Sequence, residues 1–291
     1  MSTRAEPPRP ALTWGRFCSY VKLEHTLFSV PVLLAAAVLA AGGRPPLDRV
    51  LVTLVAAAGA RTAGMSLNRI VDRRLDALNP RTASRELPAG KLSLGQAAAA
   101  TAVALAVYEL GALYLAPVCV ALSPLPVLVF WGYPYLKRFT PLAHFGVGLA
   151  LSLAPLGAYL AVRPDPAAAL RGSAPLVLFT FFWVSGFDII YATLDQESDR
   201  RNRLHSLPAD LGAARALRVS ALLHALAFAA LVWLMVERLH GATAWALLAV
   251  CGVLLLLEHR KATDVNLAFF KINAWLSFAV LALVLAGVFL K

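Results

Sequence analysis

The sequence predicts an all-α membrane protein with about nine transmembrane helices, and three observations lead to this fold class. Hydrophobic residues make up 59% of the 291 residues, whereas soluble domains are nearer about 45–50% apolar. Several apolar runs reach about 20 residues, which is the length that crosses the core of a bilayer. Lysine and arginine are concentrated in alternate connections between these runs, as expected for a chain threaded through a membrane.

The elements follow in order along the chain. Residues 1–15 are rich in proline and predict a disordered cytoplasmic tail, and residues 16–291 predict a single transmembrane domain. The nine predicted spans cover approximately residues 23–42, 50–72, 94–115, 117–136, 142–162, 174–195, 211–236, 241–257 and 266–289.

The basic residues predict the orientation of these spans. They lie mostly in the N-terminal segment and in every second connection, beginning with residues 69–91. Because basic loops remain in the cytoplasm, this pattern predicts a cytoplasmic N-terminus. The net charge of +11 is therefore explained by membrane topology, and we expect no nucleic-acid partner.

An acidic cluster follows the sixth predicted span. Residues 188–199 read DIIYATLDQESD, with Asp188, Tyr191, Asp195 and Asp199 at offsets of 0, 3, 7 and 11. At about 100° per residue these positions fall on one helical face. Carboxylates at the end of an intramembrane segment are costly to keep, so they predict a functional site. The alternative is a solvated acidic helix end without a ligand.

A second cluster closes the second predicted span. Residues 68–76 read NRIVDRRLD, which places Asn68, Asp72 and Asp76 on one face, and Arg61 lies about two turns earlier on the same side. Each cluster lies at the end of an apolar segment and is followed by an arginine-rich loop and then by a Leu-Pro pair. The chain therefore shows a weak tandem repeat, in which each half brings a carboxylate face to a shared centre.

Two such faces predict a site for magnesium and a diphosphate. Mg²⁺ takes one or two carboxylates together with substrate phosphates and water. Arg81 and Arg85 follow the first cluster, and Lys137 and Arg138 follow the fourth span, so basic groups for the anion lie nearby. For Arg81 and Arg138 the alternative is a plain topological signal.

A diphosphate bound above an apolar tunnel indicates a polyprenyl diphosphate as the ligand, with its tail among the spans and membrane lipid around the protein. Breaking the C1–O bond would give an allylic cation, which negative and aromatic groups stabilise and an electron-rich acceptor captures. Tyr133, beside Lys137, is a further candidate for contact with this substrate.

At these residues the chain resembles the UbiA superfamily of intramembrane aromatic prenyltransferases. The family motif NxxxDxxxD is matched by Asn68, Asp72 and Asp76, and the motif DxxYxxxDxxxD is matched by the residues from Asp188 to Asp199. The resemblance implies nine transmembrane helices around a central cavity, capped by cytoplasmic helical loops. It also implies Mg²⁺ that bridges the aspartates to a prenyl diphosphate.

The resemblance further implies roles for the candidate residues. Metal binding falls to the acidic and amide side chains of both motifs, and diphosphate binding to the basic residues that the family places nearby. Tyr191 would orient a carboxylate or face the cation, and Arg61 would bind the carboxylate of the acceptor. The metal candidates are Asn68, Asp72, Asp76, Asp188, Asp195 and Asp199, and the further substrate-binding candidates are Arg61, Arg81, Arg85, Tyr133 and Lys137.

Four stretches resemble the bacterial branch that prenylates 4-hydroxybenzoate-type acids, which implies an inner-membrane enzyme of ubiquinone biosynthesis with an aromatic hydroxy acid as acceptor. They are residues 22–31, 133–144, 186–201 and 267–275. A hydroxynaphthoate on a menaquinone route stays open as the acceptor. Haem farnesyltransferase, chlorophyll-type synthase and lipid-ether synthase activities are further alternatives within the enzyme class. A secondary transporter, with tandem halves and buried charges, is the alternative from another class.

Overall fold

The computed structural model describes residues 13–22, 26–262 and 271–290, and within these ranges the chain is helical and has no strand. Most of the predicted tail, residues 1–12, lies outside the described residues. The helices are α1 (Trp14–Val21), α2 (Thr26–Ala41), α3 (Leu47–Leu78), α4 (Leu94–Leu115), α5 (Pro117–Leu122), α6 (Pro124–Leu136), α7 (Ala143–Val162), α8 (Pro166–Ala192), the 3₁₀ helix η2 (Thr193–Asp195), α9 (Gln196–Arg201), α10 (Leu207–Leu211), α11 (Ala213–Arg238), α12 (Ala242–Arg260) and α13 (Asn273–Phe289).

Local sequence signals explain where several of these helices begin. Ser93 and Gln96 form a capping box at the start of α4, in which each side chain binds the backbone of the other residue. Asp165 caps α8 by accepting hydrogen bonds from the amides of Ala167 and Ala168, at 3.0 and 3.1 Å. This cap places the start of α8 eight residues before the predicted start of the sixth span.

Seven helical segments are long and apolar enough to cross a membrane, so the chain is an integral membrane protein. Two shorter apolar helices are present as well, at Ser29–Ala41 and Asn273–Phe289. The predicted count of nine spans is not confirmed, because these two described helices are shorter than a full span. Residues 23–25 and 263–270, beside them, lie outside the described residues.

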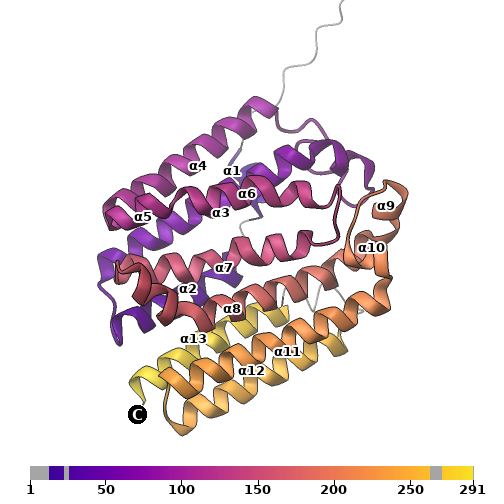
Figure 1. The fold of residues 1–291 in the computed structure, drawn as a ribbon. Coiled ribbons are helices and arrows are strands. Elements are labelled where there is room, and N and C mark those ends of the chain that lie inside the picture. The colour runs from indigo at the N-terminus through magenta and orange to yellow at the C-terminus, as the bar shows by residue number, and fades with distance from the viewer. Residues whose placement is uncertain (1–12, 23–25, 263–270, 291) are drawn as a thin grey trace, which may run out of the picture.

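The long helices run side by side between two ends of the molecule (Figure 1). Helix α3 packs against α4 and α6, and α7 packs against α2, α6 and α8. Helices α11, α12 and α13 complete the bundle, with α11 against α8 and α13 against α2. The short helices α9 and α10 lie at one end, and the C-terminal end of α13 lies at the other (Figure 1).

The main hydrophobic core lies between α2, α8, α11, α12 and α13. Phe179 and Trp183 stack there with ring centroids 5.2 Å apart, and Phe187 meets Trp183 edge-on at 5.4 Å. This core fixes α8 along most of its length. The helix can therefore present its last turns as a rigid support for polar side chains at the α9–α10 end.

Candidate functional site

A polar pocket of about 220 Å³ lies at the end of the bundle that carries α9 and α10. Its walls come from the last turns of α3 and α8, the first turn of α7 and the segments after α3, α6 and α9. Every residue of the two predicted motifs lines it, and so do Arg81, Arg85, Tyr133 and Lys137. The motif residues are Asn68, Asp72, Asp76, Asp188, Tyr191, Asp195 and Asp199. The structure thus brings the two motifs together, as the sequence predicted.

The first motif lies on α3, and its two aspartates are paired with basic side chains. Lys137 Nζ donates to Asp72 Oδ2 at 2.5 Å, and Arg85 Nη1 donates to Asp76 Oδ1 at 2.8 Å. The Asp72 and Asp76 side chains are only 3% and 8% exposed, so each carboxylate is held in a largely dry environment by a cation from another segment. Arg138 lies near the same group, with Nη2 3.8 Å from Asp72 Oδ1.

Asp195 of the second motif is bound by the loop that follows the first motif. Arg81 holds both carboxylate oxygens, and its Nε donates to Oδ1 at 2.8 Å. Asn79 Nδ2 donates to the same oxygen at 2.7 Å. Arg81 also donates to the Tyr191 hydroxyl at 2.7 Å and lies over the Tyr191 ring. These contacts join the two halves of the predicted repeat at one point.

The charge of Arg81 is stabilised by this arrangement. Burial disfavours the charged guanidinium, but the hydrogen bond and the charge of Asp195 outweigh that cost, and together with Tyr191 they raise the pKa of Arg81. Arg81 therefore lines the polar pocket and forms an ion pair with a carboxylate of the second motif.

Among the described residues, neither of the two remaining aspartates of the second motif forms an ion pair with lysine or arginine. Asp188 Oδ2 lies 2.7 Å from His144 Nδ1, on α7. Asp199 Oδ2 accepts a hydrogen bond of 3.0 Å from the Ser206 hydroxyl, which also caps α10 through the Ala209 amide. Loop residues between α9 and α10 therefore close over the second motif.

The second motif is not carried by one continuous α-helix, which corrects the sequence-based expectation. Helix α8 ends at Ala192, Asp195 lies in η2, and Asp199 lies in α9. Thr193 Oγ1 donates to the carbonyl of Ile190 at 2.7 Å, a local bond that competes with regular helical pairing. Residues from α8, η2 and α9 nevertheless line the same pocket.

The donor atoms in the pocket fit a hard divalent cation. Asp72 Oδ1 and Asp76 Oδ2 are fully buried and have no hydrogen-bond partner, which is unusual for carboxylate oxygens. Oxygens of this kind are the ligands that Mg²⁺ prefers. Within the described residues, however, no three His, Cys, Asp or Glu side chains already form one metal site. The predicted six-residue ligand set is therefore not preassembled, and substrate phosphates and water would have to complete the coordination.

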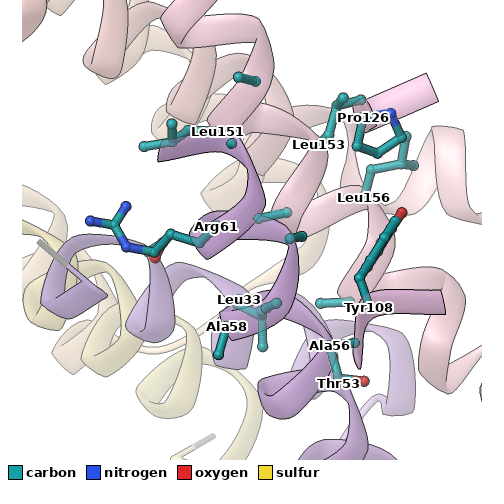
Figure 2. Close-up of a pocket in the computed structure, with 18 of the residues that line it drawn as sticks. Leu33, Thr53, Ala56, Ala58, Arg61, Tyr108, Pro126, Leu151, Leu153 and Leu156 are labelled. Carbon is teal, nitrogen blue, oxygen red and sulfur yellow. The ribbon is translucent and has the colours of Figure 1, made fainter. Parts of the chain in front are cut away.

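A second, apolar pocket of about 230 Å³ adjoins the polar one and is lined by α2 to α7. Its walls are mainly alanine and leucine side chains, such as Leu33 and Leu151, and Arg61 lies at its side (Figure 2). Arg61 Nη2 donates to the Lys22 carbonyl at 3.1 Å. Arg61 thus lines this pocket and not the pocket of the aspartates. Among the described residues, Tyr133 alone lines both pockets.

The sequence did not predict several polar residues of the pocket, among them Asn79, His144 and Ser206, which bind motif aspartates. Asn79 lies three residues after Asp76, and this spacing was the one signal available for it. His144 and Ser206 bind aspartates that are 44 and 7 residues away along the chain. A single His or Ser near a membrane edge gives no pattern from which such a pairing follows.

Known proteins match this chain over most of its length. A profile described as the UbiA prenyltransferase family matches residues 29–277. A 4-hydroxybenzoate octaprenyltransferase of Xanthomonas campestris pv. campestris (strain B100) is 32% identical over 303 aligned positions, covering 98% of this chain and 97% of that protein.

Solved structures share the fold. A UbiA homologue from Aeropyrum pernix K1, in its apo form, is 34% identical with a TM-score of 0.80, over 92% of this chain and 98% of that chain. A UbiA homologue from Archaeoglobus fulgidus bound to DMAPP and Mg²⁺ is 18% identical with a TM-score of 0.67, over 93% of this chain and 99% of that chain. The family and the all-α fold are thus confirmed.

Proposed function

This chain belongs to the UbiA prenyltransferase family, and from that premise we propose that it transfers a polyprenyl group from a polyprenyl diphosphate to 4-hydroxybenzoate. The new bond forms at the ring carbon ortho to the hydroxyl, and the reaction depends on Mg²⁺. The similarity to proteins named 4-hydroxybenzoate octaprenyltransferase supports this choice of acceptor. The product would serve ubiquinone biosynthesis.

One observation carries the proposal, which is the junction of a polar pocket with an apolar one at Tyr133. A prenyl diphosphate has a highly charged head and an apolar tail, so the two pockets match its two parts. With the diphosphate among the carboxylates and basic residues, and the tail among the alanines and leucines, C1 lies close to Tyr133. The aromatic ring is then in place to stabilise positive charge at C1.

The basic residues would hold the diphosphate. Arg85 and Lys137 already carry their donors into the polar pocket, where they bind Asp76 and Asp72. Phosphate oxygens are alternative partners for both, and the guanidinium can grip them with two parallel bonds. Arg81 holds the Asp195 carboxylate in place. It also binds the Tyr191 hydroxyl and so orients the Tyr191 ring at the wall of the pocket.

The acidic residues of both motifs would hold magnesium, with Asp72 and Asp76 offering the buried oxygens that accept no hydrogen bond from the described residues. When bound, Mg²⁺ neutralises negative charge on the diphosphate and so favours its departure. UbiA homologues of Archaeoglobus fulgidus bound to Mg²⁺ with DMAPP or with GPP support this assignment.

The acceptor would approach from the apolar side. The guanidinium of Arg61 lines that pocket, and we assign to it the role of binding the carboxylate of the hydroxybenzoate. In the transfer the C1–O bond breaks with its electrons on the diphosphate, and the ring carbon bonds to C1. The proton on that carbon then leaves to water or to a carboxylate of the cluster.

The location of the site follows from charge. The polar pocket lies at the end of the bundle where the basic loops after α3, α6 and α9 meet. By the positive-inside rule this end faces the cytoplasm, where magnesium and the soluble acceptor are available. The proteins named octaprenyltransferase come from bacteria, which supports the inner membrane as the location.

A prenyl-transfer assay tests the function. Purified protein receives geranyl diphosphate and Mg²⁺, with 4-hydroxybenzoate in one reaction and 1,4-dihydroxy-6-naphthoate in another. We expect product with the benzoate, and loss of product with EDTA or in Asp195→Ala. Product with the naphthoate alone would move the enzyme to menaquinone biosynthesis. Product with neither would refute both acceptors, and transport of the same compounds into proteoliposomes would then be measured.

A further inference from the structure

His144 is a buried histidine at the start of α7, and it lies between the second motif and the loop that closes over it. Its side chain is 5% exposed. The two ring nitrogens have different partners, since Nδ1 lies 2.7 Å from Asp188 Oδ2 and Nε2 lies 3.3 Å from the Leu207 amide nitrogen. The imidazole therefore spans the gap between α8 and α10.

The partners determine which nitrogen carries the proton. A backbone amide can only donate, so Nε2 must accept from Leu207 and cannot be protonated. The proton of the neutral ring is then on Nδ1, from which it is donated to Asp188. The backbone of α10 thereby selects the tautomer that binds the carboxylate, as the outer partners of a metal site orient its ligands.

The partner of the Asp188 carboxylate differs from the partners of three other motif aspartates. Asp72, Asp76 and Asp195 each form an ion pair with lysine or arginine. In the described part of the chain, the only hydrogen bond that reaches the Asp188 carboxylate comes from the His144 ring. Asp188 therefore has an oriented carboxylate without a lysine or arginine partner, and its other oxygen, Oδ1, accepts no hydrogen bond from the described residues.

The contact also connects Asp188 to the rest of the closing loop. The backbone amide of His205 donates a hydrogen bond of 2.7 Å to the Lys137 carbonyl, and the Ser206 hydroxyl donates one to Asp199. Leu207, the next residue, holds His144. Three consecutive residues thus bind the Lys137 backbone, Asp199 and the histidine that holds Asp188. The position of the loop and the orientation of two aspartates depend on each other.

We propose that His144 is a positioning residue for Asp188, which holds one carboxylate oxygen through Nδ1–H and directs the other into the polar pocket for a divalent cation. The inference rests on the proposed metal-dependent function and adds to it a residue outside both aspartate motifs. At Asp188 the cation does not have to displace a lysine or arginine, as it does at the paired oxygens of Asp72, Asp76 and Asp195.

Two substitutions separate the two contacts of the ring. In His144→Asn the amide nitrogen can occupy a position near that of Nδ1, so the bond to Asp188 is kept and the bond to Leu207 is lost. In His144→Gln the longer side chain reaches the position of Nε2, so the contact with Leu207 is kept and the bond to Asp188 is lost. His240→Gln, at an exposed histidine at the other end of the bundle, is the matched control.

Metal binding is measured without turnover. Mn²⁺, as a paramagnetic substitute for Mg²⁺, is titrated into purified protein with inorganic pyrophosphate, and free Mn²⁺ is followed by electron paramagnetic resonance. Loss of an outer partner of a metal ligand weakens binding by about 10–100-fold. We expect a loss of this size in His144→Gln, little change in His144→Asn and none in His240→Gln. In turnover, excess Mg²⁺ should restore most of the rate of His144→Gln.

The outcomes distinguish this inference from the proposed function. If Asp188→Asn loses Mn²⁺ binding while His144→Gln binds as the unmodified protein does, His144 does not position Asp188 and the inference is wrong. Equal losses in His144→Asn and His144→Gln would also overturn it, because they would indicate a packing role between α7 and α10. If Asp188→Asn itself binds Mn²⁺ normally, the second motif holds no metal, and the proposed metal-dependent function fails with the inference.

Discussion

Lys137 Nζ lies 2.5 Å from Asp72 Oδ2, so the central aspartate of the first motif has its own counter-ion within the protein. Arg85 with Asp76, and Arg81 with Asp195, repeat this arrangement around the same pocket. The carboxylates are thus neutralised by residues that also suit diphosphate. We expect substrate and metal to bind by exchange, in which the cations turn to the phosphates and the metal takes the carboxylates.

Removal of metal should therefore stop the reaction without unfolding the protein. Buried carboxylates that relied on a metal for neutralisation would repel one another once it was removed, but here lysine or arginine pairs with Asp72, Asp76 and Asp195. We expect EDTA to abolish prenyl transfer and to leave the melting temperature of the detergent-solubilised protein unchanged, as followed by tryptophan fluorescence. A large fall in melting temperature would show that the ion pairs do not replace the metal.

Removal of Lys137 should destabilise the protein through Asp72. In Lys137→Met a carboxylate that is 3% exposed loses its closest cation, and Arg138 remains at 3.8 Å. Breaking a fully buried pair costs about 3–5 kcal/mol, and we expect less here because Lys137 is partly exposed and Arg138 remains. The double variant Lys137→Met/Asp72→Asn should recover much of this loss. Denaturation by SDS measures the stability of both variants. If the double variant is as unstable as Lys137→Met, the loss of stability comes from packing of the aliphatic part of the lysine side chain.

Arg61 should affect one substrate more than the other. It lines the apolar pocket, away from the carboxylate pocket, so we expect Arg61→Ala to raise the KM of the aromatic acid more than that of the prenyl diphosphate. A hydrogen-bonded charged pair contributes about 1.5–3 kcal/mol, which corresponds to roughly a 10–150-fold change in KM. Arg44→Ala, at an exposed arginine before α3, is the control. A larger effect on the diphosphate would place Arg61 at the head of the donor.

The sequence predicted the parts of the site that repeat at helical spacing and missed those that depend on tertiary contacts. Asp72 and Asp76 follow Asn68 on one regular helix, and the structure places all three on α3 in one pocket. The second motif also lines the pocket, although its α-helix ends at Ala192 and the motif continues through η2 and α9.

His144 illustrates what could not be predicted. Its partners, Asp188 and the Leu207 amide, come from segments 44 and 63 residues away, and no local spacing encodes such contacts. The fold class could be predicted because apolar runs are long and local. The count of spans could not be confirmed, because it depends on the ends of two short helices beside residues that the structure does not describe.

Gly146 should be required for the position of Tyr133. A Cβ atom at this residue of α7 would lie 2.6 Å from Tyr133 Cβ, which is closer than two non-bonded carbon atoms can approach. We expect Gly146→Ala to displace the Tyr133 ring at the junction of the two pockets and to lower kcat at least tenfold, with the protein still folded. Gly132→Ala is the matched control, because a Cβ there meets no atom within 4 Å. Equal rates in both variants would exclude Tyr133 from a role that depends on its position.

A buried polar network holds α8 to the C-terminal helices, away from both pockets. Trp183 Nε1 donates to Asn273 Oδ1 at 2.6 Å, and Asn273 Nδ2 donates to Glu258 Oε1 at 2.9 Å. Glu258 is fully buried, and its Oε2 lies 3.6 Å from His224 Nδ1. The network joins α8, α11, α12 and α13 inside the core that supports the second motif.

Substitution of Glu258 should therefore change stability according to whether the acceptor is kept. Glu258→Gln retains an oxygen for Asn273, so we expect stability close to that of the unmodified protein. Glu258→Met has a similar length but removes the acceptor, and loss of one partner of a buried hydrogen bond costs about 1–3 kcal/mol. Unfolding by SDS, with Glu237→Met as an exposed control on α11, measures the difference. Equal stability of the Gln and Met variants would show that packing alone, and not this hydrogen bond, fixes α8 against α12 and α13.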